Sequence, residues 1–145
     1  MKIVLQRVRE ASVSVQGERI AAIGPGLLLL VAIEKGDADN SVFRAAEKIA
    51  SLRIFADERG RMNLSIREVK GSILSVSQFT LAGDLTRGNR PGFEGAEKPE
   101  LAAEMFRRFN GALRQQGLEV AEGRFGVMME VALVNDGPVT FILEK

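Results

Sequence analysis

The apolar run LLLLVAI, residues Leu27–Ile33, constrains the fold more than any other segment of the chain. It follows the break Gly24-Pro25-Gly26, has no polar position, and has the length of one strand, far too short to cross a bilayer. A strand that is apolar throughout is buried on both of its faces. We therefore expect this segment at the centre of a sheet.

Further strands surround this segment in the sequence. Alternating or strand-rich stretches predict them at Met1–Val8, Ala11–Gln16, Arg19–Ile23, Arg53–Phe55, Ser65–Ile66, Gly71–Thr80, Val127–Val134 and Val139–Leu143. The turn Gln16-Gly17-Glu18 joins two of these strands into a predicted hairpin.

Two helices are predicted between the strands. The first can be capped by Asp39, Asn40 or Ser41 and runs to about Leu52. The second begins at Pro99 and ends at Gly117. Its apolar stripe consists of Leu101, Met105, Phe106, Phe109 and Leu113. Because strands and helices do not alternate regularly, we expect one α+β domain over residues 1–145 with mostly antiparallel sheet.

The absence of histidine and cysteine narrows the possible chemistry. It excludes disulfides, thiolate nucleophiles and every Ser-His or Cys-His mechanism. A metal-dependent hydrolase is disfavoured as well, because no carboxylate cluster has ligand spacing, and no cofactor or metal is expected. Catalysis in this chain must use hydroxyls, carboxylates, lysine, backbone N–H groups or a group on the substrate.

Charge and the N-terminal stretch bound the partners and the compartment. The net charge is +1, so contact with nucleic acid requires a local basic patch. The first ten residues, MKIVLQRVRE, read as a strand and not as a secretory signal. We expect a cytoplasmic protein that has no membrane partner.

The segment Ser77-Gln78-Phe79-Thr80 places three polar side chains at a strand end. They precede a glycine-rich loop, Gly83–Glu97, whose length is typical of functional or disordered loops. One interpretation is a strand end that satisfies its own backbone. The other is the rim of a site, where backbone N–H groups hold an oxyanion and the polar side chains orient an ester. No base lies nearby in sequence, so we do not expect a covalent acyl-enzyme at Ser77 or Thr80.

The second motif is NDGPVT, residues Asn135–Thr140, which lies between two strand-like runs. Proline cannot donate a ladder hydrogen bond, so Gly-Pro most simply indicates a turn here. The pair also fixes two carbonyl groups, and glycine has no Cβ to block a ligand. If the Gly137–Pro138 bond is cis, both carbonyls point the same way and suit an ammonium group.

Together, SQFTL (Ser77–Leu81) and NDGPVTF (Asn135–Phe141) resemble the D-aminoacyl-tRNA deacylase family. Three more segments share the resemblance: LQRVREASVSV (Leu5–Val15), RIFADERGRMN (Arg53–Asn63) and RGNRPGF (Arg87–Phe93). The resemblance covers essentially the whole chain, and the order and separation of the motifs make it specific. It implies the fold of that family, with a barrel-like core and two main helices.

The resemblance also implies an activity. Members of the family hydrolyse the ester that joins a D-amino acid, and in some cases glycine, to the 3′-terminal adenosine of tRNA, with help from the ribose 2′-hydroxyl. They work as homodimers in which Gly-cis-Pro, here Gly137-Pro138, reaches into the partner's pocket, binds the α-ammonium and rejects an L side chain. Asn135, Val139 and Thr140 belong to the same substrate-binding motif.

The remaining roles follow from the same resemblance. The N–H of Phe79, together with that of Thr80, is expected to stabilise the oxyanion, while Ser77 and Gln78 position the adenosine or the ester. Arg7, Arg87 and Arg90 are candidates for contact with the tRNA acceptor end.

Two rival interpretations stay open from the sequence. The chain could be a dimeric module that binds an RNA end or an amino acid without chemistry. It could also be a related editing enzyme in which the Gly-Pro bond is trans and chirality is less strictly selected.

Overall fold

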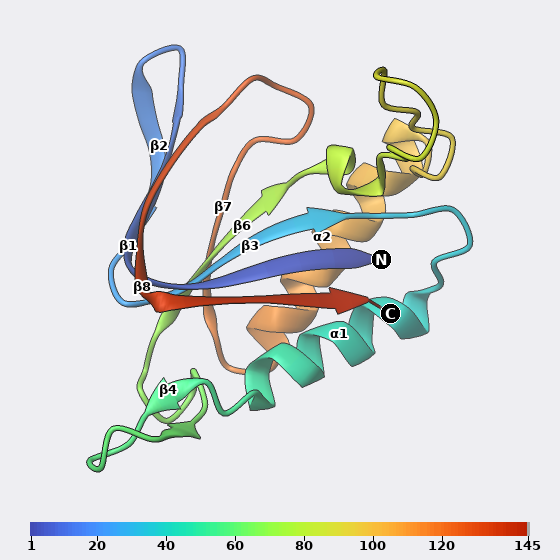
Figure 1. Cartoon of the computed structure of the whole chain (residues 1–145). Helices are drawn as coiled ribbons and strands as arrows, with labels where there is room; N and C mark the ends of the chain where they lie inside the picture. Colours follow the sequence, from blue (N-terminus) through green and yellow to red (C-terminus); the bar gives the residue numbers. More distant parts are fainter. Residues whose placement is uncertain (145) are drawn as a thin grey trace.

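Strand β1 (Lys2–Val15) organises the sheet because it pairs with three other strands (Figure 1). Residues 1–144 are described by the computed structural model. Along one edge, β1 pairs with β3 (Gly26–Ala32) and then with β2 (Glu18–Ile23). Along the other edge it pairs with β8 (Glu130–Glu144), and all three pairings are antiparallel.

The sheet continues from β3 through two parallel pairings, first with β6 (Ser72–Ser77) and then with β7 (Glu119–Glu122). A separate antiparallel hairpin is formed by β4 (Phe55–Ala56) and β5 (Met62–Leu64). The bent strands β1 and β8 curl the sheet into a barrel-like core (Figure 1). The α+β class and the mostly antiparallel pairing are confirmed.

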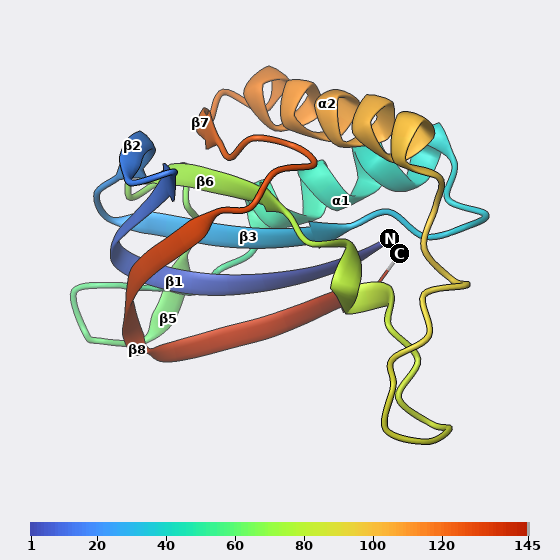
Figure 2. The ribbon, with the colours of Figure 1, turned by 90° about the horizontal axis from the view of Figure 1, so that it is seen from above.

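Helices α1 (Asp39–Ser51) and α2 (Pro99–Gln115) cover one face of the sheet (Figure 2). On that side, Leu27, Leu29 and Val31 of β3 belong to the main core between sheet and helices. Leu28 of the same strand packs on the opposite side in a second apolar cluster. The predicted central strand is therefore confirmed as buried on both faces. Neither helix has the length and apolar character needed to span a membrane, as judged from residues 1–144.

The predicted helices are confirmed, with two corrections. The residue before α1 is Ala38, and no side chain caps that end, so the prediction of a cap at Asp39, Asn40 or Ser41 is wrong. In α2, Leu101 is 49% exposed, while Ala102 takes the place in the buried stripe. The other four residues of the predicted stripe, Met105, Phe106, Phe109 and Leu113, are buried as predicted.

Two predicted breaks are not breaks between strands. The predicted strands Met1–Val8 and Ala11–Gln16 are one strand, β1, which spans Lys2–Val15. The predicted strands Val127–Val134 and Val139–Leu143 are also one strand, β8, which begins only at Glu130. The β1–β8 ladder is irregular where the Gly-Pro lies: Gln6 pairs with Thr140 and Val8 with Asn135, so residues 136–139 face only Arg7. Pro138 thus lies in a bulge, where no ladder bond requires its missing N–H, and the simple turn interpretation is wrong.

Four shorter strands also differ from the prediction. Strand β6 ends at Ser77 instead of Thr80, and β7 was not predicted. The strands predicted at Arg53–Phe55 and Ser65–Ile66 lie instead at β4 and β5. Ser65 begins a turn because the carboxylate of Glu68 accepts its backbone N–H at 2.6 Å and its hydroxyl at 2.7 Å.

Candidate functional site

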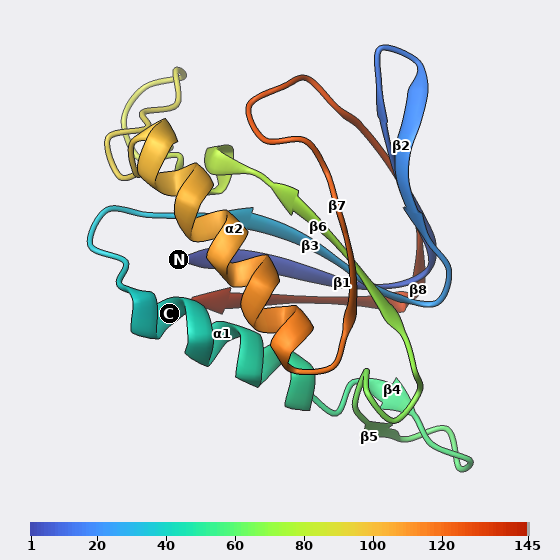
Figure 3. The same cartoon turned by 180° about the vertical axis from the view of Figure 1, so that it is seen from behind.

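A cavity of about 640 Å³ opens where β6 leaves the sheet. All four predicted catalytic residues, Ser77 to Thr80, line it. Other lining residues come from the first turn of α2 and from the segment that leads into β8. Figure 3 shows where α2, β6 and β8 run. Its lining residues are Val76, Ser77, Gln78, Phe79, Thr80, Glu97, Pro99, Ala102, Phe125, Gly126, Val127, Met128, Met129 and Val131. The cavity is mostly apolar, and its polar groups are concentrated on one wall, as in many small-molecule sites.

The change from strand to helix at this wall leaves two donors available. The N–H of Gln78 donates to the carbonyl oxygen of Val31 at 2.7 Å, which ties the end of β6 to β3. A short 3₁₀ helix, η1 (Phe79–Ala82), then begins. Its first bond runs from the N–H of Leu81 to the carbonyl oxygen of Gln78 at 3.1 Å. The N–H groups of Phe79 and Thr80 precede that bond and have no acceptor within the helix.

The polar side chains of the same wall make a small network. The Gln78 amide Nε2 donates to Thr80 Oγ1. No histidine or cysteine exists to activate a hydroxyl. Glu97 is the one titratable side chain that lines the cavity among the described residues, and its carboxylate accepts the N–H of Lys98 at 2.8 Å. This wall offers hydrogen-bond donors to a developing negative charge, not a nucleophile with its base.

Sequence reasoning missed part of the cavity. Residues 125–129 were interpreted in part as the start of a strand, yet Met128 is 91% exposed and lies on the cavity rim. The signal that could have found them is the apolar run Val127–Met129 directly after a glycine, with no alternation to hold it in a sheet. Glu97 carried no motif signal.

The NDGPVT segment is a second, tightly bonded cluster. Asn135 reaches across the bulge: its Oδ1 accepts the N–H of Val139 at 2.8 Å, and its Nδ2 donates to Thr140 Oγ1 at 3.1 Å. The Gly137–Pro138 peptide bond is cis. Gly137 has φ +144°, a conformation that favours glycine, and a Cβ there would lie 2.6 Å from a methyl carbon of Val139.

Arg7 holds this cluster from the facing strand. Its Nε donates to the carbonyl oxygen of Asp136 at 2.9 Å, and its Nη1 donates to the carbonyl oxygen of Ile54 at 2.7 Å. The Arg7 side chain is only 13% exposed. Arg9, on the same strand, is 75% exposed and reaches only the Asp136 carboxylate at 3.4 Å. The guanidinium of Arg7 thus links the bulge to the segment between α1 and β4.

Within one chain, the two predicted motifs do not meet. None of Asn135, Gly137, Pro138, Val139 and Thr140 lines the cavity that contains Ser77 to Thr80. Arg87 and Arg90 lie on the loop that follows η1, whereas Arg7 lies with the Gly-Pro bulge.

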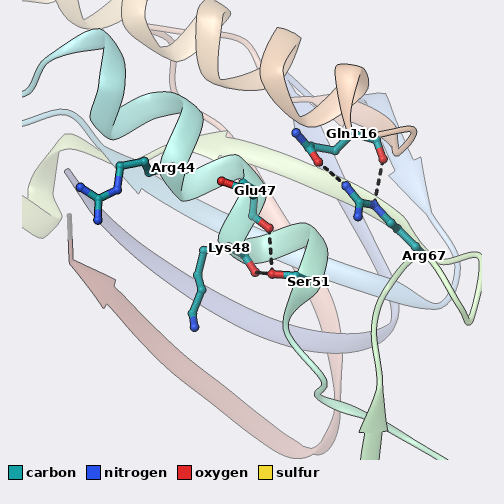
Figure 4. Close-up of a pocket in the computed structure, with 6 residues that line it drawn as sticks. All are labelled: Arg44, Glu47, Lys48, Ser51, Arg67 and Gln116. Atoms are coloured by element: carbon teal, nitrogen blue, oxygen red, sulfur yellow. Dashed lines mark hydrogen bonds between the residues drawn. The ribbon is translucent and has the colours of Figure 1, made fainter.

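The other hollows offer less chemistry. One is lined by Arg44, Glu47, Lys48, Ser51, Arg67 and Gln116 (Figure 4). Its cations do not converge on a common point: Arg67 donates to Gln116, and Arg44 and Lys48 extend away from it. Within residues 1–144, no three His, Cys, Asp or Glu side chains gather as metal ligands would.

Sequence comparisons match this chain to one family over nearly its whole length. A sequence profile described as D-Tyr-tRNA(Tyr) deacylase matches residues 4–144. A protein of Exiguobacterium sibiricum named D-aminoacyl-tRNA deacylase is 57% identical over 145 residues, which is the full length of both chains. A protein of the same name from Geobacter sulfurreducens is 53% identical and is matched over 99% of this chain and 95% of its own.

Two solved structures share the fold. One, titled c-Myc DNA Unwinding Element Binding Protein, is 41% identical with a TM-score of 0.94, over 100% of this chain and 99% of that one. The other, titled as a probable eukaryotic D-amino acid tRNA deacylase, has a TM-score of 0.84 at 18% identity, over 98% of this chain and 97% of that one. The latter supports the fold alone. With a profile match over nearly all residues and full-length relatives above half identity, the chain belongs to the D-aminoacyl-tRNA deacylase family of hydrolases.

Proposed function

We propose that this protein hydrolyses the ester of D-aminoacyl-tRNA and releases free tRNA and the D-amino acid. The observation that carries the proposal is the cavity wall at Phe79 and Thr80, where two backbone N–H groups have no helical acceptor in a member of this family. Attack of water on the ester carbonyl places negative charge on its oxygen. An N–H donor held in place stabilises that charge, and loss of one such donor costs about 3–4 kcal/mol of barrier.

A group on the substrate takes the place of a histidine base. With no histidine, no imidazole is available as the base near neutral pH. The 2′-hydroxyl of the terminal ribose lies beside the 3′-ester and orients or activates the attacking water. The hydroxyl of the water adds to the carbonyl carbon, and the bond from that carbon to the 3′-oxygen breaks. The remaining proton passes to the departing 3′-oxygen, so one water is consumed for each ester hydrolysed. Ser77 and Gln78 position the adenosine. Thr80 supports Gln78, because its Oγ1 accepts a hydrogen bond from the Gln78 side-chain amide.

The chirality filter requires a second copy of the chain. Gly137 and Pro138 are exposed and do not line the cavity of their own chain, so we assign their carbonyls to the cavity of a neighbouring copy. Among the described residues, strand β8 pairs on one edge alone, and Phe141 and Ile142 on it are exposed. A long unpaired edge with apolar side chains is normally covered. In the proposed homodimer, each Gly-Pro binds the α-ammonium in the partner's cavity and excludes an L side chain, while achiral glycine also passes.

The tRNA acceptor end needs only local cations. Arg87 and Arg90 lie on the loop next to η1, form no ion pair within residues 1–144, and can contact phosphates near the cavity. Arg7 lies with the Gly-Pro bulge and contributes through that segment. The proposed place of action is the cytoplasm, where aminoacylated tRNA is used.

Subunit mixing tests whether each site is shared. Phe79→Pro removes the proposed oxyanion N–H, and Gly137→Ala damages the filter. Each homodimer should lose activity. Mixed dimers contain one site with an intact cavity and an intact filter, so activity should return to a fraction of the wild-type value. If mixing after verified subunit exchange restores nothing, the shared site is refuted.

A binding module without chemistry is the alternative function. It predicts stoichiometric retention of D-aminoacyl-tRNA with no release of amino acid. Release measured against a protein-free control separates the two.

A further inference from the structure

The loop after η1, residues Gly83–Glu97, is anchored at its base although it projects from the body of the protein (Figures 1 and 2). Asp84 and Gly92 exchange two backbone hydrogen bonds, of 2.7 and 3.0 Å, which close the loop into a narrow neck. The Asp84 carboxylate also accepts the N–H of Thr86 at 2.9 Å, and hydrogen bonds from Thr86 lower the pKa of Asp84 below its ordinary value. The arginine-bearing tip therefore extends from a defined base.

The return arm of the loop is hydrogen-bonded to the segment that directly follows β3. The N–H of Lys35 donates to the carbonyl oxygen of Gly95 at 2.9 Å, and the N–H of Glu97 donates to that of Ile33 at 3.1 Å. Both contacts follow the end of β3, to which Gln78 is also bonded through Val31. The loop base and the cavity wall thus share one anchor.

One side chain joins the two directly. The ring of Phe93 lies against the ring of Phe79, with centroids 5.1 Å apart and planes tilted by 60°. Gly83, at the end of η1, leaves room for this contact: a Cβ there would lie 3.1 Å from the Phe93 ring and 2.9 Å from the carbonyl oxygen of Thr80. The Phe93 ring therefore lies close to both ends of η1, at Phe79 and at Gly83.

This ring pair is an aromatic contact that can fix Phe79. The Phe79 ring is 56% exposed and belongs to neither core cluster, so the body of the protein does little to hold it. An aromatic pair with this tilted geometry stabilises both rings beyond simple burial. Without Phe93, η1 would keep its backbone bonds but lose the side chain that fixes its orientation.

We propose that Phe93 is a positioning residue, which holds η1 and the arginine-bearing loop as one unit and thereby sets the direction of the Phe79 N–H. The inference rests on the proposed function for its catalytic consequence. In this proposal the loop contributes to ester hydrolysis through Phe93 and to RNA binding through its arginines. The position of the Phe79 N–H matters because misplacement of a reacting group by about 1 Å costs on the order of 100-fold in rate.

Two measurements on Phe93→Ala test the proposal. The first is kcat on a D-aminoacyl-adenosine ester, which lacks the phosphates that loop arginines would bind. The second is trypsin cleavage of the native protein at the Arg87–Gly88 bond, since the bond after Arg90 precedes proline and resists trypsin. Phe93→Tyr retains the ring and serves as the conservative variant. Phe43→Ala, on α1, removes another half-exposed phenyl ring and is the matched control.

The expected result is a loss of kcat on the order of 10–100-fold for Phe93→Ala, with KM for the small ester changed much less, and faster cleavage at Arg87–Gly88. Phe93→Tyr should recover most of the rate, and Phe43→Ala should match the wild type in both measurements. An unchanged kcat for Phe93→Ala overturns the proposal, whatever happens to cleavage. A wild-type protein that hydrolyses no D-aminoacyl ester refutes the proposed function instead, and unchanged cleavage in Phe93→Ala then overturns the anchoring role separately.

Discussion

Replacing Arg7 by alanine should destabilise the protein far more than the same change at Arg9, two residues along the same strand. Arg7 donates to two backbone carbonyl oxygens, of Ile54 and Asp136, and is 13% exposed. Each hydrogen bond from a charged donor contributes about 1.5–3 kcal/mol, and its loss leaves a carbonyl without a partner. Taking the lower value for both bonds gives about 3 kcal/mol. Arg9 makes one exposed ion pair at 3.4 Å, a type that contributes about 0–1 kcal/mol.

The assay is thermal unfolding of the two variants beside the wild type. For a domain near this size, 1 kcal/mol shifts Tm by roughly 2–4 °C, so Arg7→Ala should lower Tm by roughly 6–12 °C. Arg9→Ala should lower it by roughly 0–4 °C. Arg7→Lys should resemble Arg7→Ala, because one ammonium cannot replace two donors held in a fixed plane. Equal shifts for Arg7→Ala and Arg9→Ala would refute the reasoning that Arg7 links the bulge to the segment between α1 and β4.

Three further predictions concern single side chains. Gly137→Ala should lose D-aminoacyl-tRNA hydrolysis by local distortion, because the new Cβ would lie 2.6 Å from a methyl carbon and 2.9 Å from the backbone nitrogen of Val139; a Gly137→Ala variant with the wild-type rate would contradict this. Thr80→Ala should keep turnover within about tenfold of the wild type, as expected for loss of one hydrogen bond, and isolation of an aminoacyl–Thr80 adduct would contradict this supporting role. The pKa of Asp57 is lowered, first by the backbone N–H of Arg61, so the β4–β5 hairpin should be stabilised fully above the ordinary carboxyl pKa and lose this stabilisation as pH falls through the lowered value. Hydrogen exchange of the hairpin should show that pH dependence in the wild type and not in Asp57→Asn.

Much of the architecture could be predicted because it depends on local patterns. An apolar run with no polar position identified β3, and helical periodicity with Pro99 and Gly117 identified α2. The failures occurred where distant contacts decide the local structure. Pro138 remains within β8 because Asn135 and Arg7 bond the bulge across positions that the sequence does not show to be neighbours.

The candidate site divides in the same way. Ser77 to Thr80 are contiguous in sequence, so one motif was enough to predict that they lie together. Their setting at the start of η1, with the N–H groups of Phe79 and Thr80 outside the helix bonds, depends on the bond between Gln78 and Val31 and could not be seen from composition. The far wall, at Met128, comes from a segment with no motif. In the proposed site, Gly137 of one copy lies at the cavity of another copy. Patterns within one sequence cannot predict such a contact between two chains.

The rate of amino acid release from D-Tyr-tRNA and L-Tyr-tRNA, measured side by side with purified protein, tests the central claim most directly. The account predicts rapid release from the D ester and release from the L ester at the rate of the protein-free control. Equal release from both esters would contradict the filter at Gly137-Pro138. Binding of the D ester without release would contradict hydrolysis itself.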